Sequence, residues 1–476
     1  MKKFDYDIIV IGAGAGGFVS SKLAAGLGKK VAMVEKDKLG GECTLNGCVP
    51  SKALIHASQI ADEIRNAKRY GLGIGTHPET VINTDNVMAH VRSVVQKVYD
   101  SHPREVFQRL GIDVLFGAPK FIDNHQIELN GTRLSAGSFI ISTGSSPFIP
   151  PIEGIDAVPF LTNQTIFNLE RLPASMIVLG GGPIGVELGS ALNLLGVNIF
   201  IIDQVERILN KEDVELVDIL SKKLIEDNIK LITGYNLLKL VRKDGKISAI
   251  IQNSKKQIQE ILADSILIAV GRKANVEGLD LENAGVEYTL KGVKINNTLQ
   301  TTAANIYACG DVAGPYQFSH MAEYQAIIAT QNAFFPYKKS VNYKNVAWCT
   351  FTTPEIAHAG LTEEEARGAY GTKVKVYRYK YSNIDRGYTD VANIGMSKFI
   401  CDPKGMLLGA HILGARAGEL IHEAQIAKSL GFPFYKLYSV IHIYPTFTDV
   451  VKHAAKLCYI DKLRNNPLLR LLRKFL

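Results

Sequence analysis

The chain contains one short sequence pattern twice, and this repeat limits the possible folds more than any other feature. Residues 7–17 read Asp-Ile-Ile-Val-Ile-Gly-Ala-Gly-Ala-Gly-Gly, and residues 176–185 read Met-Ile-Val-Leu-Gly-Gly-Gly-Pro-Ile-Gly. In both places a run of apolar and β-branched residues, typical of a buried strand, leads into the spacing G-x-G-x-x-G. The glycines of the two copies are Gly12, Gly14 and Gly17, and Gly180, Gly182 and Gly185.

The residues that follow each glycine pattern complete a nucleotide-binding unit. Each copy continues with a helical stretch and a second strand that ends in an acid, Glu35 in the first copy and Asp203 in the second. Glycines let the backbone approach a pyrophosphate, the helix N-terminus favours its negative charge, and the acid accepts hydrogen bonds from ribose hydroxyls. The repeat therefore predicts two dinucleotide sites, and two dinucleotides indicate electron transfer between them.

A pair of cysteines follows the first unit. Cys43 and Cys48 lie in the stretch 40–52, Gly-Gly-Glu-Cys-Thr-Leu-Asn-Gly-Cys-Val-Pro-Ser-Lys. They could be part of a metal site, but the motif supplies no third or fourth ligand and zinc sites favour closer spacings. They could also be two inert core residues. We favour a redox-active disulfide, which needs a distorted helical turn because five residues of regular helix rise about 7.5 Å.

These motifs, in this order, resemble the class I pyridine nucleotide-disulfide oxidoreductases, a family that includes dihydrolipoamide dehydrogenase, glutathione reductase and mercuric reductase. The resemblance covers nearly the whole chain. Further matching segments are 142–144, 269–275, 306–311, 352–357 and 360–363. The resemblance implies an α/β fold with two Rossmann-like dinucleotide-binding domains, one for FAD and one for NAD, and a C-terminal α+β dimerisation domain.

The resemblance also implies a division of the chain. The FAD domain would comprise residues 1–150 and 275–345, split around an NAD(H) domain at residues 151–274. Residues 346–460 would form the dimerisation domain of a homodimer, and residues 461–476 a basic tail.

The resemblance assigns the cofactors to particular residues. FAD is expected at the first repeat and the nicotinamide cofactor at the second. Because Asp203 would repel a 2′-phosphate, NADH is predicted in preference to NADPH, although Arg207 lies close by in the sequence. The residues predicted to bind FAD are Gly12, Gly14, Gly17, Glu35, Gly41, Lys52, Thr143, Gly144 and Asp311. Those predicted to bind NAD are Gly180, Gly182, Gly185, Glu187, Asp203 and Gly271.

The resemblance further implies an electron path from NADH through FAD to Cys43 and Cys48. Cys48 would be the thiolate that lies against the flavin, and Cys43 the interchange thiol that meets the acceptor. Lys52 would approach the flavin ring, stabilise its reduced form and lower the pKa of the thiolate. Glu187 would be the partner of Lys52. The alternative for Lys52 and Glu187 is that both are solvated charges on helix surfaces.

One motif departs from the family pattern. Members that act on small disulfides end with His-Pro-Thr-x-x-Glu, in which a histidine from the partner subunit moves the proton of the interchange thiol. Here residues 441–449 read Ile-His-Ile-Tyr-Pro-Thr-Phe-Thr-Asp, so Tyr444 takes the position of the base and Asp449 that of its orienting acid. Tyrosine, with a pKa of about 10, is a poor base near pH 7. His442 is a substitute candidate, because on a strand it would share a face with Tyr444.

This departure leaves the electron acceptor open. Mercuric reductases also lack that histidine, and the segments 161–165, 181–187 and 385–387 resemble the mercuric-reductase-like branch. However, Cys458 stands alone where that branch has a cysteine pair that hands over Hg(II). The acceptor is therefore predicted to be a thiol or disulfide, a metal ion or a quinone. The alternatives are a dihydrolipoamide dehydrogenase with a substituted base and a nucleotide-binding redox sensor with little turnover.

Composition excludes several other classes of protein. The chain has 476 residues, of which 46% are apolar and 21% charged, so it is not a disordered protein. Six cysteines are too few for a disulfide scaffold, and Asp5 and Asp7 stand where the apolar core of a signal peptide would begin. We therefore predict a cytoplasmic protein, with no nucleic-acid partner and no resident metal site. Cys309, Cys349 and Cys401 are interpreted as core residues.

Half of the net charge of +8 lies in the last sixteen residues. Residues 461–476 contain five basic side chains and Asp461, which gives +4. Asn466-Pro467 is a typical helix start, and the following leucines and Phe475 would gather on one face opposite the basic residues. This pattern predicts peripheral contact with the inner face of a membrane. The alternative is a helix docked on its own domain or on the partner subunit.

Overall fold

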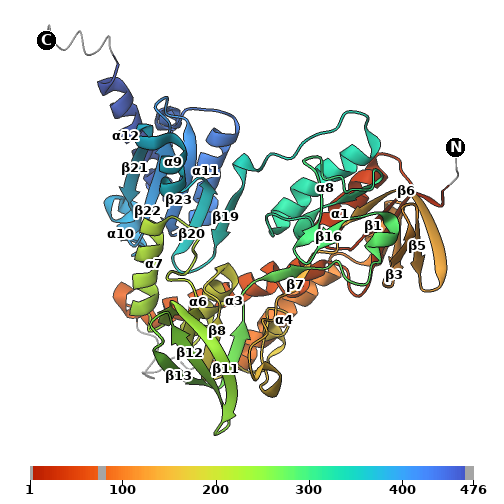
Figure 1. Ribbon diagram of the computed structural model, residues 1–476. Helices are drawn as coiled ribbons and strands as arrows, with labels where there is room; N and C mark the ends of the chain where they lie inside the picture. Colours follow the sequence, from red (N-terminus) through yellow and green to blue (C-terminus); the bar gives the residue numbers. More distant parts are fainter. Residues whose placement is uncertain (1–3, 73–81, 467–476) are drawn as a thin grey trace.

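The computed structural model describes residues 4–72 and 82–466 and contains three groups of helices and strands (Figure 1). The first group is built around a seven-stranded sheet, the second around a four-stranded sheet and the third around a five-stranded sheet. In the view of Figure 1 they lie at the right, at the bottom and at the upper left. This architecture confirms the predicted fold class, with two dinucleotide-binding units and a C-terminal α+β domain.

The first group has a parallel core in which β1 lies between β2 and β6. Successive residues of β1 enter opposite faces of the sheet. Ile8 and Val10 pack in the cluster that includes residues of α8, whereas Ile9 and Ile11 pack in a second cluster. This strand is apolar throughout because both faces of the parallel sheet are covered. The elements of this group are β1 (Tyr6–Ile11), β2 (Val31–Glu35), β3 (Ile112–Phe116), β4 (Lys120–Asp123), β5 (Gln126–Leu129), β6 (Thr132–Ile141), α1 (Ala15–Gly26), α2 (Gly41–Leu45), α3 (Cys48–Asn66), α4 (Thr84–Asp100) and α5 (Arg104–Arg109).

The seventh strand of this sheet comes from much later in the chain. Strand β18 (Ile306–Ala308) pairs in parallel with β6, with Ile306 opposite Phe139 and Ala308 opposite Ile141. Helix α8 (Ser319–Phe334) follows and lies beside α1 (Figure 1). The chain therefore leaves the first group, forms the second and returns.

The second group repeats the strand–helix–strand unit of the first. Its parallel sheet has the order β10-β9-β8-β14, and a three-stranded antiparallel sheet follows α7 and β10 in the chain. Leu54 of α3 and Met88 of α4 share a core cluster with Val186 and Leu188, so α3 packs on α6. The elements are β8 (Ser175–Leu179), α6 (Pro183–Leu194), β9 (Asn198–Asp203), α7 (Val214–Glu226), β10 (Lys230–Thr233), β11 (Tyr235–Lys243), β12 (Lys246–Asn253), β13 (Ile258–Ala263) and β14 (Ser265–Ile268). Two short antiparallel pairs are β7 (Ser145–Pro147) with β15 (Arg272–Ala274), and β16 (Tyr288–Thr289) with β17 (Gly292–Val293).

The third group is an antiparallel sheet of order β19-β20-β23-β22-β21. Side chains of α11 and α12 share a buried apolar cluster with residues of this sheet. Its elements are β19 (Ala347–Thr350), β20 (Glu355–Gly360), α9 (Glu363–Tyr370), β21 (Lys375–Lys380), α10 (Asp385–Thr389), β22 (Met396–Cys401), β23 (Leu407–Gly414), α11 (Ala417–Ser429) and α12 (Asp449–Arg464).

A row of polar and aromatic residues crosses this sheet from one edge to the other. Trp348 lies opposite His358, His358 opposite His411, His411 opposite Lys398, and Lys398 opposite Arg378. Residues paired in this way stand on one face of a sheet with their side chains adjacent. We call these five residues the cross-strand row.

The predicted basic tail does not begin as a separate segment at residue 461. Asp461 to Arg464 continue α12, which starts at Asp449. The Tyr377 hydroxyl donates to Asp461 Oδ2 over 3.1 Å, and Lys462 Nζ lies 3.7 Å from the ring centroid of Tyr435. The start of the tail is therefore docked on its own domain. The predicted amphipathic helix lies in residues 467–476, outside the described residues. Within residues 4–72 and 82–466, no helix combines the length and apolarity needed to cross a bilayer.

Candidate active site

The acids that end β2 and β9 are held by the two glycine turns in the same way. Glu35 Oε2 accepts a hydrogen bond from the backbone N–H of Ala13 over 2.8 Å. Asp203 Oδ2 accepts from that of Gly181 over 2.5 Å, again from a residue 22 positions earlier. The second oxygen of each acid accepts from the amide two residues further along the chain. Each carboxylate is thereby fixed beside the turn, with lone pairs left for a ribose.

The first and third glycines of each motif close the turns. Gly12 has a φ of +101°, and a Cβ on Gly17 would lie 1.8 Å from the Gly12 carbonyl oxygen. In the second copy, Gly180 has a φ of +114° and a Cβ on Gly185 would lie 2.0 Å from the Gly180 carbonyl oxygen. A side chain at these positions would force the strand and helix apart.

The middle glycines have a different environment. A Cβ on Gly14 would meet nothing closer than 3.8 Å, and a Cβ on Gly182 would meet no atom within 4 Å. These two glycines precede α1 and α6 as N-caps without side-chain caps. The missing Cβ atoms leave room at both helix N-termini, which fits the close approach of a pyrophosphate at each.

The cysteine pair lies where a helix is interrupted. Helix α2 ends at Leu45 and α3 begins at Cys48, so Asn46 and Gly47 separate the two. A Cβ on Gly47 would lie 2.9 Å from the carbonyl oxygen of Glu42, which means that glycine permits the close return of the chain. The distortion expected from the sequence is present as this break. Cys43 and Cys48 are free thiols that hydrogen-bond to each other.

The two thiols have opposite protonation preferences. The hydrogen bond from Cys43, a contact with the Ser319 hydroxyl at 3.6 Å and the charge of Lys52 lower the pKa of Cys48 to about 6, against the opposing effect of burial. The same interaction, together with burial, raises the pKa of Cys43. At neutral pH the pair is therefore a Cys48 thiolate that accepts a hydrogen bond from the Cys43 thiol.

Lys52 and Glu187 form an ion pair beside the cysteines. Lys52 Nζ lies 2.8 Å from Glu187 Oε2. The other Glu187 oxygen accepts the backbone N–H of Phe351 over 2.9 Å, and Lys52 Nζ lies 4.3 Å from the Phe351 ring centroid. Glu187 is only 7% exposed, so the alternative of a solvated surface charge does not hold for it. The pair joins α3, α6 and the third group at one point.

Asp311 lies at the end of β18, close to the short strand β7. Its Oδ2 accepts a hydrogen bond from the Ser145 hydroxyl over 2.5 Å, and Arg272 Nε lies 3.7 Å away. Burial raises the pKa of this carboxyl group. The return of β18 to the first sheet thus brings Asp311 to the side of the molecule that holds the cysteine pair.

The connection between the first and second groups is fastened at Thr143 and Gly144. The Thr143 hydroxyl donates to the carbonyl oxygen of Asn275 over 2.7 Å, and the Asn275 amide donates to the Gly144 carbonyl over 3.0 Å. Gly271 accepts a hydrogen bond from the amide of Phe148.

A Cβ on Gly41 would lie 2.7 Å from the Cα of Gly14, so α2 packs directly on the first glycine turn.

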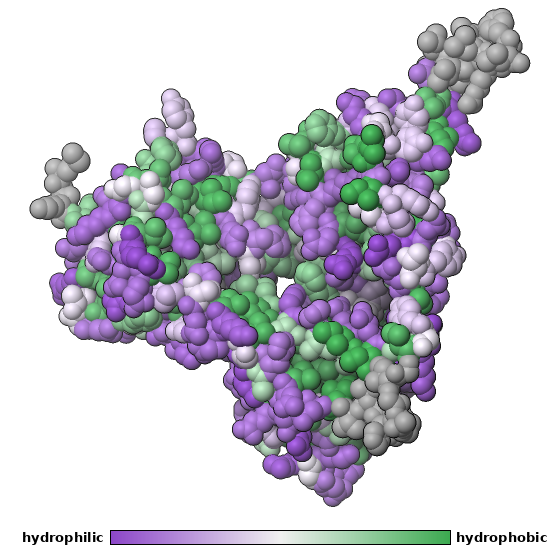
Figure 2. Space-filling model, turned by 180° about the vertical axis from the view of Figure 1, so that it is seen from behind, coloured by the Kyte–Doolittle hydropathy of each residue, from purple (hydrophilic) through white to green (hydrophobic). Residues whose placement is uncertain are grey.

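One cavity of about 890 Å³ connects many of the predicted site residues. It is lined by elements of all three groups, and Figure 2 shows the molecular surface hollowed where they meet. The predicted residues in its wall are Gly14, Cys43, Cys48, Lys52, Glu187 and Asp311.

Several residues of this site are absent from the sequence-based prediction. Asn163 Nδ2 donates to Glu42 over 2.5 Å, and Arg272 Nη2 lies 3.2 Å from the same carboxylate oxygen. These contacts fix the residue that precedes Cys43. Asn163 belongs to a segment that the sequence marked only by resemblance to one branch of the family. Ser319, which touches Cys48, carried no sequence signal because 271 positions separate the two residues.

The C-terminal residues predicted to supply a base do not line this cavity in their own chain, and the family resemblance implies that they act from the partner subunit. Residues 440–448 form no strand, so the expected shared face of His442 and Tyr444 is wrong. His442 Nδ1 lies 2.8 Å from the Val440 carbonyl oxygen and Nε2 2.7 Å from Glu423 Oε1. The Tyr444 hydroxyl donates to Asp385 rather than to Asp449. Tyr444 is 67% exposed and Asp449 only 3%, which separates the predicted pair.

The remaining cysteines lie mostly in the core. Cys309 and Cys401 are fully buried, as expected, whereas Cys349 is partly exposed and lines the cavity. Cys458 stands alone in the sequence but is also buried and hydrogen-bonds to Cys401. This second thiol pair lies in the interior of the third group, between β22 and α12.

Comparisons with known proteins agree with this geometry. Residues 6–327 match the family model Pyridine nucleotide-disulphide oxidoreductase, and residues 346–455 match that family's dimerisation domain. The chain is 34% identical over 454 residues to a mercuric reductase of Staphylococcus aureus, covering 95% of this chain and 82% of that protein. It is 35% identical over 456 residues to a dihydrolipoyl dehydrogenase of Thermus scotoductus, covering 95% of this chain and 97% of that protein.

Two similar solved structures extend the comparison. The HOCl-induced flavoprotein disulfide reductase RclA of Escherichia coli superposes with a TM-score of 0.85 at 26% identity, covering 95% of this chain and all of that one. The Cu(II) complex of the same protein gives a TM-score of 0.84 at 26% identity, covering 96% of this chain and all of that one.

Proposed function

Because the chain belongs to the pyridine nucleotide-disulphide oxidoreductase family, we propose that it uses a pyridine nucleotide to reduce a thiol-reactive metal ion at Cys43 and Cys48. It is an NAD(P)H-dependent flavoprotein disulfide oxidoreductase, and its dimerisation domain indicates a homodimer. The observation that carries the proposal is the thiol–thiolate pair, with a Cys48 pKa of about 6, in the cavity lined by Lys52 and Asp311.

The predicted cofactor sites and domain boundaries enter this proposal unchanged. FAD, when bound, supplies a two-electron carrier between nicotinamide and disulfide. The first glycine turn, Glu35, Lys52, Gly41, Thr143, Gly144 and Asp311 would hold it. The second turn, Glu187, Asp203 and Gly271 would hold the nicotinamide nucleotide. The pairing of β18 with β6 supports a flavin domain formed by residues 1–150 and 275–345 around a nucleotide domain at residues 151–274.

The cysteine pair accounts for the electrons and protons of acceptor reduction. Cys43 as a thiol and Cys48 as a thiolate together lose two electrons and one proton when the S–S bond forms. Those electrons reduce one Hg(II) ion to Hg(0), or two Cu(II) ions to Cu(I), and the proton leaves from Cys43. NADH then restores the pair by giving up a hydride, because a disulfide and one hydride together yield the Cys43 thiol and the Cys48 thiolate with no further proton gained or lost. Lys52 keeps positive charge beside Cys48, and Glu187 holds Lys52 there.

A metal ion suits this site better than a small disulfide for two reasons. A disulfide acceptor needs a base that takes the proton of the interchange thiol, and Tyr444 stands in the position of that base. The hydrogen bond to Asp385 raises its pKa, so the hydroxyl stays protonated at neutral pH and cannot take that proton. A soft metal ion instead binds thiolate directly. The similar mercuric reductase and the Cu(II) complex of RclA support this choice.

An acceptor panel tests the proposal. With NADH as donor, the FAD-loaded protein is expected to reduce Hg(II) or Cu(II) at least about tenfold faster than lipoamide, glutathione disulfide or a quinone. The rate of NADH oxidation and the reduced metal product are both measured. Faster turnover of lipoamide than of either metal ion would contradict the proposal.

A second candidate function is dihydrolipoamide dehydrogenation with a substituted base. It is favoured by the contact between His442 and Glu423, since a histidine oriented by a carboxylate is the usual proton carrier of such sites. Under this candidate, His442→Gln lowers lipoamide turnover by at least about 100-fold. Under the metal-ion proposal, the same variant reduces the metal ion at a rate within about twofold of the wild-type rate.

NADH is expected to be the preferred donor. Asp203 Oδ2 accepts from Gly181 in the second glycine turn and Oδ1 from the amide of Val205, so the carboxylate is fixed beside the turn, where it would repel a 2′-phosphate. Arg207, which could neutralise such a phosphate, has its Nε 4.0 Å from Asp218 Oδ1. Asp203→Asn is expected to lower the ratio of kcat/KM for NADH over NADPH about tenfold, equivalent to about 1.4 kcal/mol. Steady-state rates with both donors measure this, and a wild-type preference for NADPH would refute it.

The thiolate of Cys48 is expected to titrate near pH 6 in the reduced protein. Its pKa lies below the ordinary value, so thiolate absorbance should persist above pH 6 and disappear as the pH falls through this value. Lys52→Met should raise the midpoint, because the positive charge of Lys52 favours the thiolate. Lys68→Met, an exposed lysine beyond the end of α3, is the matched control. A midpoint unchanged by Lys52→Met would show that the charge does not act on Cys48.

The location of the protein and its contact with a membrane stay predictions. They depend on the sequence of residues 461–476, of which only the first six are described, and on the composition of the chain. If a quinone is the acceptor, contact between the tail and anionic lipid would bring the cavity close to it.

A further inference from the structure

A second cluster of chemically reactive side chains lies at the junction of the second and third groups. Glu212 comes from the segment between β9 and α7, His358 from β20 and His411 from β23. Each offers one ligand atom, and these atoms lie within 4.8 Å of one another. The three residues are 5%, 2% and 1% exposed. None of them lines the cavity that holds the cysteine pair.

The hydrogen bonds of the two histidines fix where their lone pairs point. His358 Nε2 lies 2.7 Å from the Gly360 carbonyl oxygen, and His411 Nε2 lies 2.9 Å from that of Leu361. A carbonyl oxygen only accepts, so both Nε2 atoms carry a hydrogen. In a neutral imidazole, the Nδ1 atom then has no hydrogen and carries a free lone pair. Both rings therefore present Nδ1 as an acceptor.

No donor meets these lone pairs among the residues that the structure describes. His358 Nδ1 faces Glu212 Oε2 at 3.1 Å, and His411 Nδ1 is buried without a hydrogen-bond partner. Two imidazole nitrogens and a carboxylate oxygen are thus assembled as acceptors in one place, where buried acceptors need a shared cation or proton.

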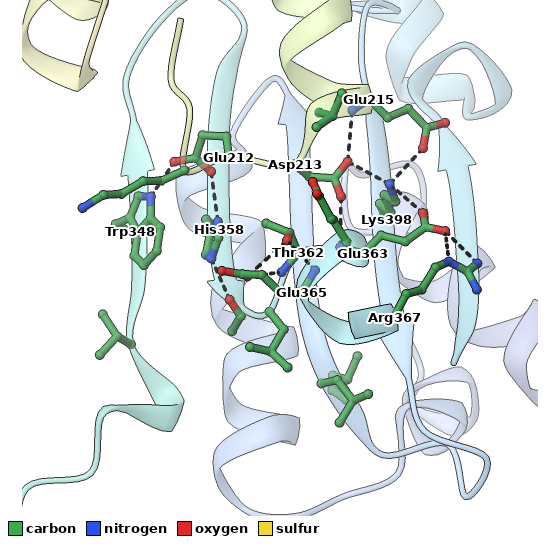
Figure 3. A pocket seen from close by; sticks show the side chains of 18 of the residues that line it. Glu212, Asp213, Glu215, Trp348, His358, Thr362, Glu363, Glu365, Arg367 and Lys398 are labelled. Carbon is green, nitrogen blue, oxygen red and sulfur yellow. Dashed lines mark hydrogen bonds and ion pairs between the residues drawn. The ribbon is translucent and has the colours of Figure 1, made fainter. Parts of the chain in front are cut away.

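The charges around the cluster leave Glu212 without a basic partner. Lys398 Nζ lies 2.8 Å from Asp213, 3.0 Å from Glu215 and 2.8 Å from Glu363, as Figure 3 shows. Glu212 instead contacts Trp348 Nε1 at 2.5 Å and His358 (Figure 3). Within the described ranges, no lysine or arginine forms an ion pair with it. A carboxylate this deeply buried needs a nearby cation or a proton.

The surroundings hold all three side chains in orientation. Trp348 stacks on His358 with ring centroids 3.8 Å apart, and His411 meets His358 edge-on at 4.5 Å. Neighbouring positions in the cross-strand row fix these contacts, and the indole N–H fixes the second oxygen of Glu212. Histidine ligands of metal ions usually donate their other ring N–H to a carbonyl or carboxylate, as both rings do here. A cavity of about 1220 Å³, lined in part by Glu212 and His358, gives access from solvent.

We propose that Glu212, His358 and His411 bind one divalent transition-metal ion, for which Zn²⁺ is the best match. Two imidazoles and one carboxylate are a known zinc ligand set, and a fourth position would face the cavity. The ion would tie the segment before α7 to β20 and β23, and so fix the second group against the third. This role is independent of electron transfer and departs from the sequence analysis, which predicts no resident metal site.

The competing explanation is a protonated His358 that pairs with Glu212 without any ion. It accounts for the 3.1 Å contact and for the charge of Glu212. It leaves His411 Nδ1 without a partner. It also predicts that no zinc binds at these three residues, so that any zinc the protein takes up would bind equally well to the His411→Gln variant. A zinc titration therefore separates the two explanations.

The experiment uses the full-length, FAD-loaded protein with Cys43→Ser and Cys48→Ser, because the active-site thiols would themselves bind zinc. After removal of metal with a chelator, the protein is titrated with Zn²⁺ and the bound metal is measured by mass spectrometry. One zinc per chain is expected. Glu212→Gln and His411→Gln in this background should each weaken binding at least about 100-fold. His90→Gln, which changes an exposed histidine on α4, is the matched control and should leave binding unchanged.

A spectroscopic measurement keeps the proposal testable even where a site variant does not fold. Zinc X-ray absorption of the double-serine protein should show only nitrogen and oxygen ligands, at about 2.0–2.1 Å, with scattering from two imidazoles. A sulfur shell, zinc binding that Glu212→Gln leaves unchanged, or no retained zinc in the double-serine protein would each overturn the proposal. The thermal unfolding midpoint should also rise with zinc in this protein and not in the His411→Gln variant.

Discussion

Cys43→Ser is expected to lower NADH-driven reduction of a metal ion by about 1,000-fold or more, because it removes the thiol that meets the acceptor. FAD should stay bound, since no glycine-turn residue is changed. Cys48 would then lack the hydrogen bond from a thiol that most lowers its pKa, although the serine hydroxyl can donate in its place. Anaerobic addition of NADH should still bleach the flavin absorbance while the acceptor is left unreduced.

The matched control for this variant is Cys349→Ser. Cys349 lines the same cavity, but burial raises its pKa, so it is a protonated thiol at neutral pH. Its replacement should keep acceptor reduction within about threefold of wild type. If Cys43→Ser retained wild-type rates, electrons would leave the protein without passing through the cysteine pair.

Gly17→Ala is expected to abolish FAD binding. The added Cβ would lie 1.8 Å from the carbonyl oxygen of Gly12, which is a backbone atom and cannot rotate away. Helix α1 would have to move away from the turn after β1, which disrupts the cradle for the pyrophosphate. We expect protein without flavin absorbance and a loss of about 3 kcal/mol or more in the free energy of unfolding. The ratio of visible to ultraviolet absorbance and a denaturant titration measure both effects.

Gly26→Ala provides the comparison within the same helix. A Cβ on Gly26, the last residue of α1, would meet no atom within 4 Å. This variant should bind FAD like wild type and gain stability by up to about 1 kcal/mol, because alanine favours helix more than glycine does. Equal flavin content in the Gly17→Ala and Gly26→Ala proteins would show that closure of the first turn is not needed for FAD binding.

Features that depend on neighbouring residues could be predicted from the sequence. The glycine turns and the acids that end the next strands are joined by about 20 residues of strand and helix, so their geometry follows from the local fold. Glu35 and Asp203 reach back to the residue 22 positions earlier in both copies. The break between α2 and α3 was equally predictable, because two cysteines five positions apart cannot meet on a regular helix.

Contacts between distant segments could not be predicted in this way. His358 and His411 meet because β20 and β23 pair in one particular register, and no sequence pattern records that register. The partner of Tyr444 is Asp385, 59 positions away, whereas the motif indicated Asp449. Cys401 and Cys458 likewise come together only when α12 packs on the sheet. A motif names the residues of a site, but tertiary packing selects the partners of each.

The late arrival of β18 determines the order in which a newly synthesised chain can fold. The edge of β6 at Phe139–Ile141 has no neighbour there until Ile306–Ala308 has left the ribosome. At about 5–20 residues per second, that interval lasts roughly ten to thirty seconds. Strands β8 to β14 lie wholly within it, so the sheet of the second group can form while the first group still exposes an open strand edge. Such an edge is prone to pair with other chains, so a chaperone that covers it during this interval would protect the nascent protein.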